Sequence, residues 1–125
     1  MNVVDTSGWI EYFRKGPNVA FFRPAILDVE RLLIPTVCLT EVIRFITRAA
    51  NRDVAAEAAA NMQRGTVVPL DAGLADFAAR LGLRHNLPLA DSIVYATARS
   101  YDAVLFTQDE DFKKLPGVRL VRTKY

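Results

Sequence analysis

Four acidic residues stand where the sequence predicts that strands end and helices begin. Asp5 directly follows a short apolar run, and Asp109 comes shortly after another. Glu41 falls in the second turn of a helix expected after a third apolar run, and Asp91 opens a later helix. In open sheets of parallel strands, ligands bind in the crevice beyond the carboxyl ends of the strands. We therefore expect the four carboxylates to meet at one edge of a sheet.

Carboxylates held close together repel one another at neutral pH, because each negative charge opposes the ionisation of its neighbours. A divalent cation relieves that repulsion, and Mg2+ and Mn2+ prefer hard oxygen ligands. Such a site can hydrolyse a phosphodiester without histidine, because the metal lowers the pKa of a bound water and stabilises the charge that develops on the phosphate. The residues therefore predict metal-assisted phosphodiester hydrolysis, with either one or two ions.

Taken singly, each acid also has an ordinary structural interpretation. An acid at a helix start can cap the helix or interact with its dipole, and an acid within a helix can form a surface ion pair. These alternatives are helix or turn capping for Asp5, Asp91, Asp109 and Asp111, and pairing with Arg44 for Glu41. The hypothesis of a metal site depends on all four acids lying close together at one end of the sheet.

Length and composition predict a single domain over residues 1–125. A chain of 125 residues is near the usual domain size, and 51% hydrophobic with 24% charged residues is typical of a globular protein. No apolar stretch is long enough to span a membrane, and the first residues do not resemble a secretory signal. We expect a cytoplasmic protein with no membrane partner.

The single cysteine and the single histidine argue against several other kinds of site. Cys38 has no second cysteine to pair with, a thiolate zinc site is disfavoured, and a small buried hydrophobic role is expected. His85 stands where a helix should end, at a position where a cation interacts favourably with the helix dipole. Catalytic triads that depend on histidine are therefore not favoured.

The charge balance suits a polyanionic ligand without requiring one. The chain has 16 Lys and Arg and 14 Asp and Glu, a net charge of +2. If the four acids are neutralised by metal, 16 basic residues face 10 acidic ones, a balance of +6. Arg44 and Arg48 recur at helical spacing from Glu41 and are the first candidates for contact with the ligand. Arg14, Lys15, Lys113 and Lys114 are further candidates, with a solvated surface as the ordinary alternative.

Alternating apolar runs and helical patterns predict an α/β fold with a mostly parallel sheet, because parallel strands need crossover connections of about this length. The expected strands are 2–4, 32–34, 66–68 and 103–106, with a possible fifth at 118–121. The first expected helix is capped by Ser7 and ends near residue 13, and the second runs over 18–30 with a kink or restart near Pro24. The third runs over 36–50 with a threonine cap. Three more are expected over 53–62, 71–81 (capped by Asp71) and 90–101.

Four segments resemble, in order, the motifs of the PIN-domain family, and in particular the VapC-type toxins of toxin–antitoxin pairs. The resemblance spans residues 3–121, and its specificity comes from the order and separation of the motifs. The matching segments are the strand ending in Asp5, Thr6 and Ser7, the helix carrying Glu41, the helix opened by Asp91 and followed by small residues, and the strand ending in Thr107 followed by Asp109, Asp111 and Phe112.

The resemblance implies a PIN-like three-layer α/β/α sandwich and a Mg2+-dependent endoribonuclease, in which Mn2+ can replace Mg2+. It also implies that the catalytic and metal-binding residues are Asp5, Glu41, Asp91 and Asp109, supported by Thr6, Ser7, Thr107 and Asp111. Asp109 and Asp111 are both candidates for the fourth acid. We prefer Asp109, with Asp111 outside the direct ligands or bound through water.

The resemblance further implies three partners: an RNA substrate, a cognate VapB-type antitoxin whose tail covers the site, and a second copy in a homodimer. RNA loops offer accessible backbone and unstacked bases, but no motif specifies the RNA target. The alanine-rich helix and the residues Phe21, Phe22 and Ile26 are candidate surfaces for the protein contacts. Core packing is the ordinary alternative for them.

Two other functions fit parts of the sequence. A catalytically inactive PIN-like module that binds RNA or protein is disfavoured because no acid is missing, and a metal titration discriminates it. A receiver-type or phosphatase domain would use Asp5 as a phosphorylated nucleophile. It is disfavoured because Ser7 stands where a phosphatase has a second aspartate, and no suitable lysine follows a late strand.

Overall fold

Five short strands form the central sheet of the computed structural model, which describes residues 1–124. All four strand pairings are parallel, and the order across the sheet is β3-β2-β1-β4-β5. The prediction of a mostly parallel sheet is confirmed, and the fifth expected strand is a full member of it. The strands are β1 (Asn2–Val4), β2 (Leu32–Pro35), β3 (Thr66–Val68), β4 (Val104–Thr107) and β5 (Val118–Leu120).

Helices connect each strand to the next within the described residues. Two short 3-10 helices, η1 (Val29–Arg31) and η2 (Glu110–Phe112), precede β2 and β5. The α-helices are α1 (Thr6–Phe13), α2 (Val19–Leu27), α3 (Thr36–Ala49), α4 (Arg52–Met62), α5 (Ala72–His85) and α6 (Leu89–Ser100).

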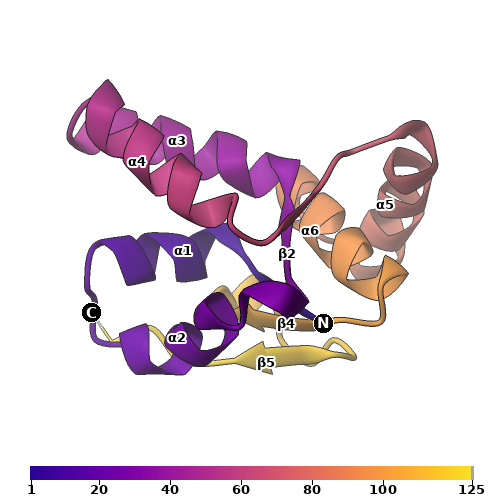
Figure 1. The fold of residues 1–125 in the computed structure, drawn as a ribbon. Helices are drawn as coiled ribbons and strands as arrows, with labels where there is room; N and C mark the ends of the chain where they lie inside the picture. The colour runs from indigo at the N-terminus through magenta and orange to yellow at the C-terminus, as the bar shows by residue number, and fades with distance from the viewer. Residues whose placement is uncertain (125) are drawn as a thin grey trace.

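The strand order reverses between β1 and β4. The chain moves outward from β1 to β2 and β3 and then returns to the other side of β1 as β4. Because such crossovers are right-handed, helices before and after the reversal cover opposite faces, which gives the three layers of an α/β/α sandwich. Figure 1 shows α1 and α2 on one side of β2 and the pair α5 and α6 on the other. The reversal leaves a crevice beyond the ends of β1 and β4.

The core lies on both faces of the sheet. Leu32, Leu33 and Ile34 of β2 are at most 1% exposed, as expected for a strand that is covered on both faces. Cys38 is fully buried as predicted, and burial raises the pKa of its thiol far above the usual value. His85 is the last residue of α5, where it was expected, and it packs edge-on against Tyr95.

Several suggested partner surfaces belong instead to the core. Phe22 and Ile26 of α2 are buried, as are Ala55, Ala58 and Ala59 of α4. These side chains fill space against the sheet and neighbouring helices, so the suggestion that they form partner surfaces is wrong for all five. Phe21 is half-buried and packs edge-on against Phe106 of β4.

Two predicted helix caps are also wrong. Ser7 lies within α1, which begins at Thr6 and is capped by Asp5 through the backbone N–H of Gly8. Thr36 is the first residue of α3, after an N-cap at Pro35 that makes no side-chain bond. In both cases the strand passes almost directly into the helix, which leaves no room for the expected cap. Asp71 does cap α5, as predicted.

Helix α2 runs through Pro24 as one helix and ends at Leu27, before the expected end at residue 30. There is therefore no restart at the proline. The remainder of the segment expected to be helical forms η1, which leads directly into β2.

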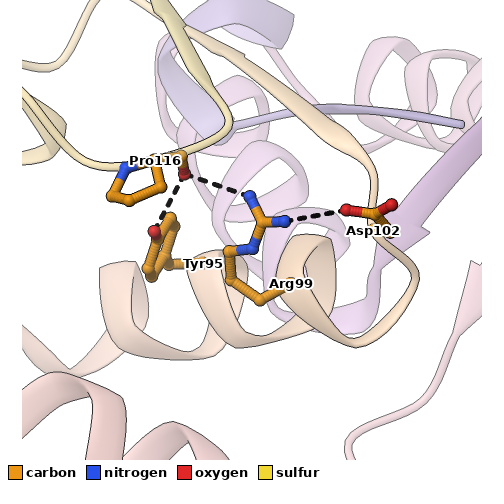
Figure 2. A network of polar contacts seen from close by, with 4 residues as sticks. All are labelled: Tyr95, Arg99, Asp102 and Pro116. Atoms are coloured by element: carbon orange, nitrogen blue, oxygen red, sulfur yellow. Dashed lines mark hydrogen bonds and ion pairs between the residues drawn. The ribbon is translucent and has the colours of Figure 1, made fainter.

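A polar cluster on α6 holds the turn before β5. Pro116 O accepts hydrogen bonds from the Tyr95 hydroxyl (2.9 Å) and from Arg99 Nη1 (3.1 Å), and Arg99 Nη2 pairs with Asp102 (3.0 Å), as Figure 2 shows. Gly117, at φ 76°, follows directly, and a Cβ there would lie 1.8 Å from Arg99 Nη1. The cluster thereby fixes where β5 begins beside β4.

Candidate functional site

The four predicted acids lie around one pocket of about 260 Å³. Asp5 follows β1, Glu41 comes from α3, Asp91 from the first turn of α6, and Asp109 from the segment after β4. The pocket therefore lies at the reversal point of the sheet, where the crevice was expected. Its other lining residues are Thr6, Ser7, Ile10 and Val94.

Asp5 is the most buried of these acids, at 4% exposure. Its Oδ1 accepts hydrogen bonds from Ser7 Oγ (2.7 Å) and from the Gly8 N–H (3.0 Å), whereas Oδ2 accepts only one from residues 1–124, that of Thr107 Oγ1 (2.7 Å). Each carboxylate oxygen has about two acceptor positions, so Oδ2 retains one. Asp5 therefore caps α1, as its ordinary interpretation predicts, and still has an oxygen available for a ligand.

Burial raises the pKa of Asp5 from 3.8 to about 6. The hydrogen bonds from Thr107, Ser7 and Gly8 lower the pKa and so oppose this effect, while the charge of Asp109 adds to it. The carboxyl group is thus strongly hydrogen-bonded but poorly solvated. A nearby cation would favour its ionised form.

Thr107 connects the ends of β1 and β4. Its hydroxyl donates to Asp5 Oδ2 and accepts from the backbone N–H of Asp109 (2.9 Å). Ser7 makes a parallel connection, because its Oγ donates to Asp5 and accepts from the Gln108 N–H (3.3 Å). These two hydroxyl groups connect the segment carrying Asp109 to Asp5.

Asp91, Asp109 and Asp111 each offer an oxygen, and the three oxygens lie within 4.8 Å of one another. The pKa of Asp91 is raised to about 8, mainly by burial and also by the neighbouring charges of Asp109, Asp111 and Asp5 and a hydrogen bond with Asp111. The structure therefore brings both candidates for the fourth acid to Asp91. Asp109 also caps η2 by accepting from the Asp111 N–H (2.9 Å).

Glu41 joins the pocket from α3. Its Oε1 accepts a hydrogen bond of 2.5 Å from Thr6 Oγ1, the residue next to Asp5. No ion pair between Glu41 and Arg44 is found among residues 1–124, so the surface pairing considered for Glu41 is absent there. Thr6 thus orients Glu41 much as Thr107 orients the segment of Asp109.

This donor set fits a hard divalent cation. All of the pocket's ionisable groups are carboxylates, which Mg2+ and Mn2+ accept as ligands, and like charges account for part of the raised pKa of Asp91. Asp5 Oδ2 has an open acceptor position, and Asp91, Asp109 and Asp111 are close enough to share one ion. These carboxylates could therefore hold a divalent cation between them.

A second hollow of about 510 Å³ adjoins the acid pocket and shares Thr6, Ile10 and Glu41 with it. Arg44 and Arg48, both exposed, line this hollow with Phe45 and Ala49. The two arginines therefore share the face of α3 that carries Glu41, as their helical spacing predicted.

Sequence reasoning missed two buried polar residues that do not line the pocket. Glu11 is fully buried and Asn18 is 2% exposed. Asn18 Nδ2 donates to Gln108 Oε1 (2.9 Å), next to Asp109 in the chain. One signal was available, since Glu11 is the only charged residue within the apolar helical run from Trp9 to Phe13.

The fold and the pocket define an α/β protein with a cluster of carboxylates at the reversal point of its parallel sheet. The chain belongs to the PIN domain family, whose model matches residues 3–118. No match was found among the curated proteins compared with the chain.

Several solved structures share the fold over most of their length. A toxin–antitoxin complex from Klebsiella pneumoniae has a chain that is 22% identical, with a TM-score of 0.78 and coverage of 95% of this chain and 96% of that one. VapC20 from Mycobacterium tuberculosis, a sarcin-ricin loop cleaving toxin, is 20% identical, with a TM-score of 0.74 and coverage of 90% and 92%. A DNA-bound VapBC from Salmonella typhimurium is 21% identical, with a TM-score of 0.73 and coverage of 97% and 96%. At these identities the likeness establishes the shared fold.

Within residues 1–124, no helix has the length and apolar character needed to cross a membrane.

Proposed function

We propose that this PIN domain is a divalent-metal-dependent endoribonuclease and the toxin of a toxin–antitoxin pair. The observation that carries the proposal is the convergence of Asp5, Glu41, Asp91 and Asp109, from four separate elements, on one pocket. Such a cluster is electrostatically costly unless a cation neutralises it. The cleavage activity stated for the similar VapC20 supports RNA as the substrate class.

In this proposal Asp5, Asp91, Asp109 and Glu41 hold Mg2+, or Mn2+ in its place. When bound, the cation supplies Lewis-acid stabilisation of the scissile phosphate and a more acidic water. Asp5 presents Oδ2 because Ser7 and Gly8 occupy Oδ1. Thr6 holds Glu41, and Thr107 holds the backbone of Asp109, so neither acid has to reorganise before binding.

Arg44 and Arg48 would contact the RNA backbone on its way to the acids. Both line the hollow that adjoins the acid pocket, and the exposed ring of Phe45 lies between them in the sequence. Guanidinium groups bind phosphate, and aromatic rings stack on unpaired bases. The hollow therefore suits single-stranded or looped RNA.

The test is cleavage of a looped RNA by the purified protein with Mg2+, with Mn2+ and with EDTA. Asp5→Asn and Asp91→Asn should each abolish cleavage and leave the fold intact, because each removes a ligand charge and little volume. Asp53→Asn, an exposed acid in the first turn of α4, is the matched control and should retain full activity. Full activity of both pocket variants with Mg2+ would reject the assignment, and folded wild-type protein that binds metal without cleaving RNA would favour an inactive binding module.

The toxin role and the antitoxin have their own test. The structural likeness to chains of toxin–antitoxin complexes supports a VapB-type antitoxin as partner, in a hetero-oligomer or together with a homodimer of this chain. Overproduction of the wild-type chain should arrest growth, and co-expression of the protein from the adjacent gene should restore it. Asp91→Asn should be harmless. Unimpaired growth with the wild-type chain would argue against the toxin role but not against nuclease chemistry.

A further inference from the structure

Asn18 makes buried contacts that no step of the proposed reaction uses directly. It is the N-cap residue of α2, but its side chain makes no capping bond. Instead Nδ2 donates both of its hydrogens across the molecule, to Gln108 Oε1 (2.9 Å) and to the backbone oxygen of Arg122 (3.0 Å). The carboxamide thus joins the turn after α1 to two segments about 90 and 104 positions further along the chain.

Glu11 fixes the backbone of Asn18. Its fully buried carboxylate accepts the Asn18 N–H at Oε2 (2.7 Å), and its Oε1 has no hydrogen-bond partner in the part of the chain that the structure describes. Gly16 makes this approach possible, because a Cβ there would lie 2.2 Å from Glu11 Oε1. A buried carboxylate with so few partners lowers the stability of the fold. The network formed by Glu11, Asn18 and Gln108 therefore has a stability cost that repacking with apolar residues would avoid.

Gln108 is the residue to which the network leads. It stands between Thr107, which donates to Asp5, and Asp109, which lines the acid pocket. Its N–H donates to Ser7 Oγ (3.3 Å), and its backbone oxygen accepts from Thr123 Oγ1 (3.3 Å). The side chain of Gln108 has Asn18 as its hydrogen-bond partner, so Asn18 limits how this residue can turn.

We propose that Asn18 is a positioning residue of the acid site, which holds Gln108 and thereby fixes the backbone that carries Thr107 and Asp109. The inference rests on the proposed metal site. It assigns to the buried Glu11–Asn18 pair the role of setting the distance between Asp109 and Asp5. Groups that hydrogen-bond directly to a metal's ligands typically change its affinity 10- to 100-fold when they are removed, and Asn18 acts through Gln108, so the lower end of this range is expected.

The direct test is Mn2+ affinity, measured by calorimetry on folded, metal-free protein. Asn18→Ala and Gln108→Ala should each weaken Mn2+ binding about tenfold, and the double variant should be no worse than the weaker single variant, because both remove one connection. Asn18→Asp, which keeps the size but loses both donors, should behave like Asn18→Ala. Asn61→Ala, an exposed asparagine of α4, is the matched control and should bind Mn2+ like the wild type.

Unchanged Mn2+ affinity in Asn18→Asp and Gln108→Ala would overturn the proposal. Gln108 is only half-buried, so its variant carries the test if Asn18→Ala does not fold. Hydrogen exchange gives a reading that needs no metal: the Asp109 amide, which is bonded to Thr107 Oγ1, should exchange faster in both variants. If wild-type protein binds no Mn2+, the proposed function fails, and the exchange result alone then decides whether Asn18 positions this segment.

Discussion

The acid pocket and the apolar groove between α5 and α6 differ in size and in chemistry. The groove, at about 530 Å³, is twice the volume of the acid pocket, and its lining includes Leu83 and Leu89, which are 86% and 80% exposed. The acid pocket is small, but it gathers four carboxylates at the ends of parallel strands. A large apolar hollow suits a protein surface, whereas convergent polar groups at strand ends suit catalysis.

The largest expected effect is on RNA cleavage, which should depend on the acid pocket and not on the groove. Asp109→Asn should lower RNA cleavage at least about 100-fold, because it removes a proposed ligand charge, whereas Asp111→Asn should lower it about tenfold if that acid acts through water. Leu89→Ser in the groove should leave the rate unchanged. Initial rates at saturating Mg2+ measure all three. Equal losses at Asp109 and Asp111 would make both direct ligands, and a loss at Leu89 would break the division of roles.

The stability of the metal-free protein should depend on pH through the acid pocket. The folded protein holds protons on Asp5 and Asp91 up to about pH 6 and pH 8, against a usual pKa of 3.8, so it binds more protons than the unfolded chain in that range. The contribution of these groups to the free energy of unfolding should therefore be complete below about pH 4 and should fall as the pH rises through the two folded pKa values. Asp5 alone accounts for roughly 3 kcal/mol.

Urea unfolding in EDTA at pH 5 and pH 8.5 measures this fall. Asp5→Asn should make this fall smaller, because the asparagine does not titrate, but should not abolish it, because Asp91 still does. Mn2+ should stabilise the wild type more at pH 8.5 than at pH 5. A stability that rises between these two pH values would contradict the raised pKa of both groups.

Substitutions in the α5–α6 groove should change self-association and leave catalysis unchanged. If the homodimer buries the α5–α6 groove, Leu83→Lys should shift the protein toward monomer, because a desolvated lysine opposes association. Leu27→Lys, on α2 and 57% exposed, is the control and should leave the oligomer unchanged. Light scattering coupled to gel filtration gives the mass. A dimer that persists in Leu83→Lys would place the interface elsewhere.

The smallest expected effect is that of removing the arginines of the hollow beside the acid pocket. Arg44→Ala and Arg48→Ala should each raise the KM for RNA about threefold with little change in kcat, since an exposed charge contact contributes at most about 1 kcal/mol. Each should also reduce the slope of log KM against log salt concentration by about 0.7. An unchanged slope would mean that neither arginine contacts the backbone of the RNA.

Much of the fold could be predicted because strand and helix patterns are local. The apolar runs became the five strands, with small changes at their ends, and Asp71 capped α5 as its position before a helical pattern indicated. The errors at Ser7 and Thr36 concern element boundaries, which depend on how a strand meets the next helix. The buried state of Phe22 and Ile26 depended on which face of α2 meets the sheet, and an apolar pattern cannot distinguish a core face from a partner surface.

The sequence by itself determined which acids follow strands or open helices. It also determined that these acids lie near one edge of the sheet, because the carboxyl ends of parallel strands meet at the same edge. Only the tertiary structure decided that Asp5 is buried with one open oxygen, that Asp111 approaches Asp91, and that Asn18 reaches Gln108. The physical reason is that these properties arise from contacts between distant segments. Burial, like-charge repulsion and hydrogen bonding depend on which groups lie within a few ångströms of one another. Separation along the chain does not show which distant residues come that close.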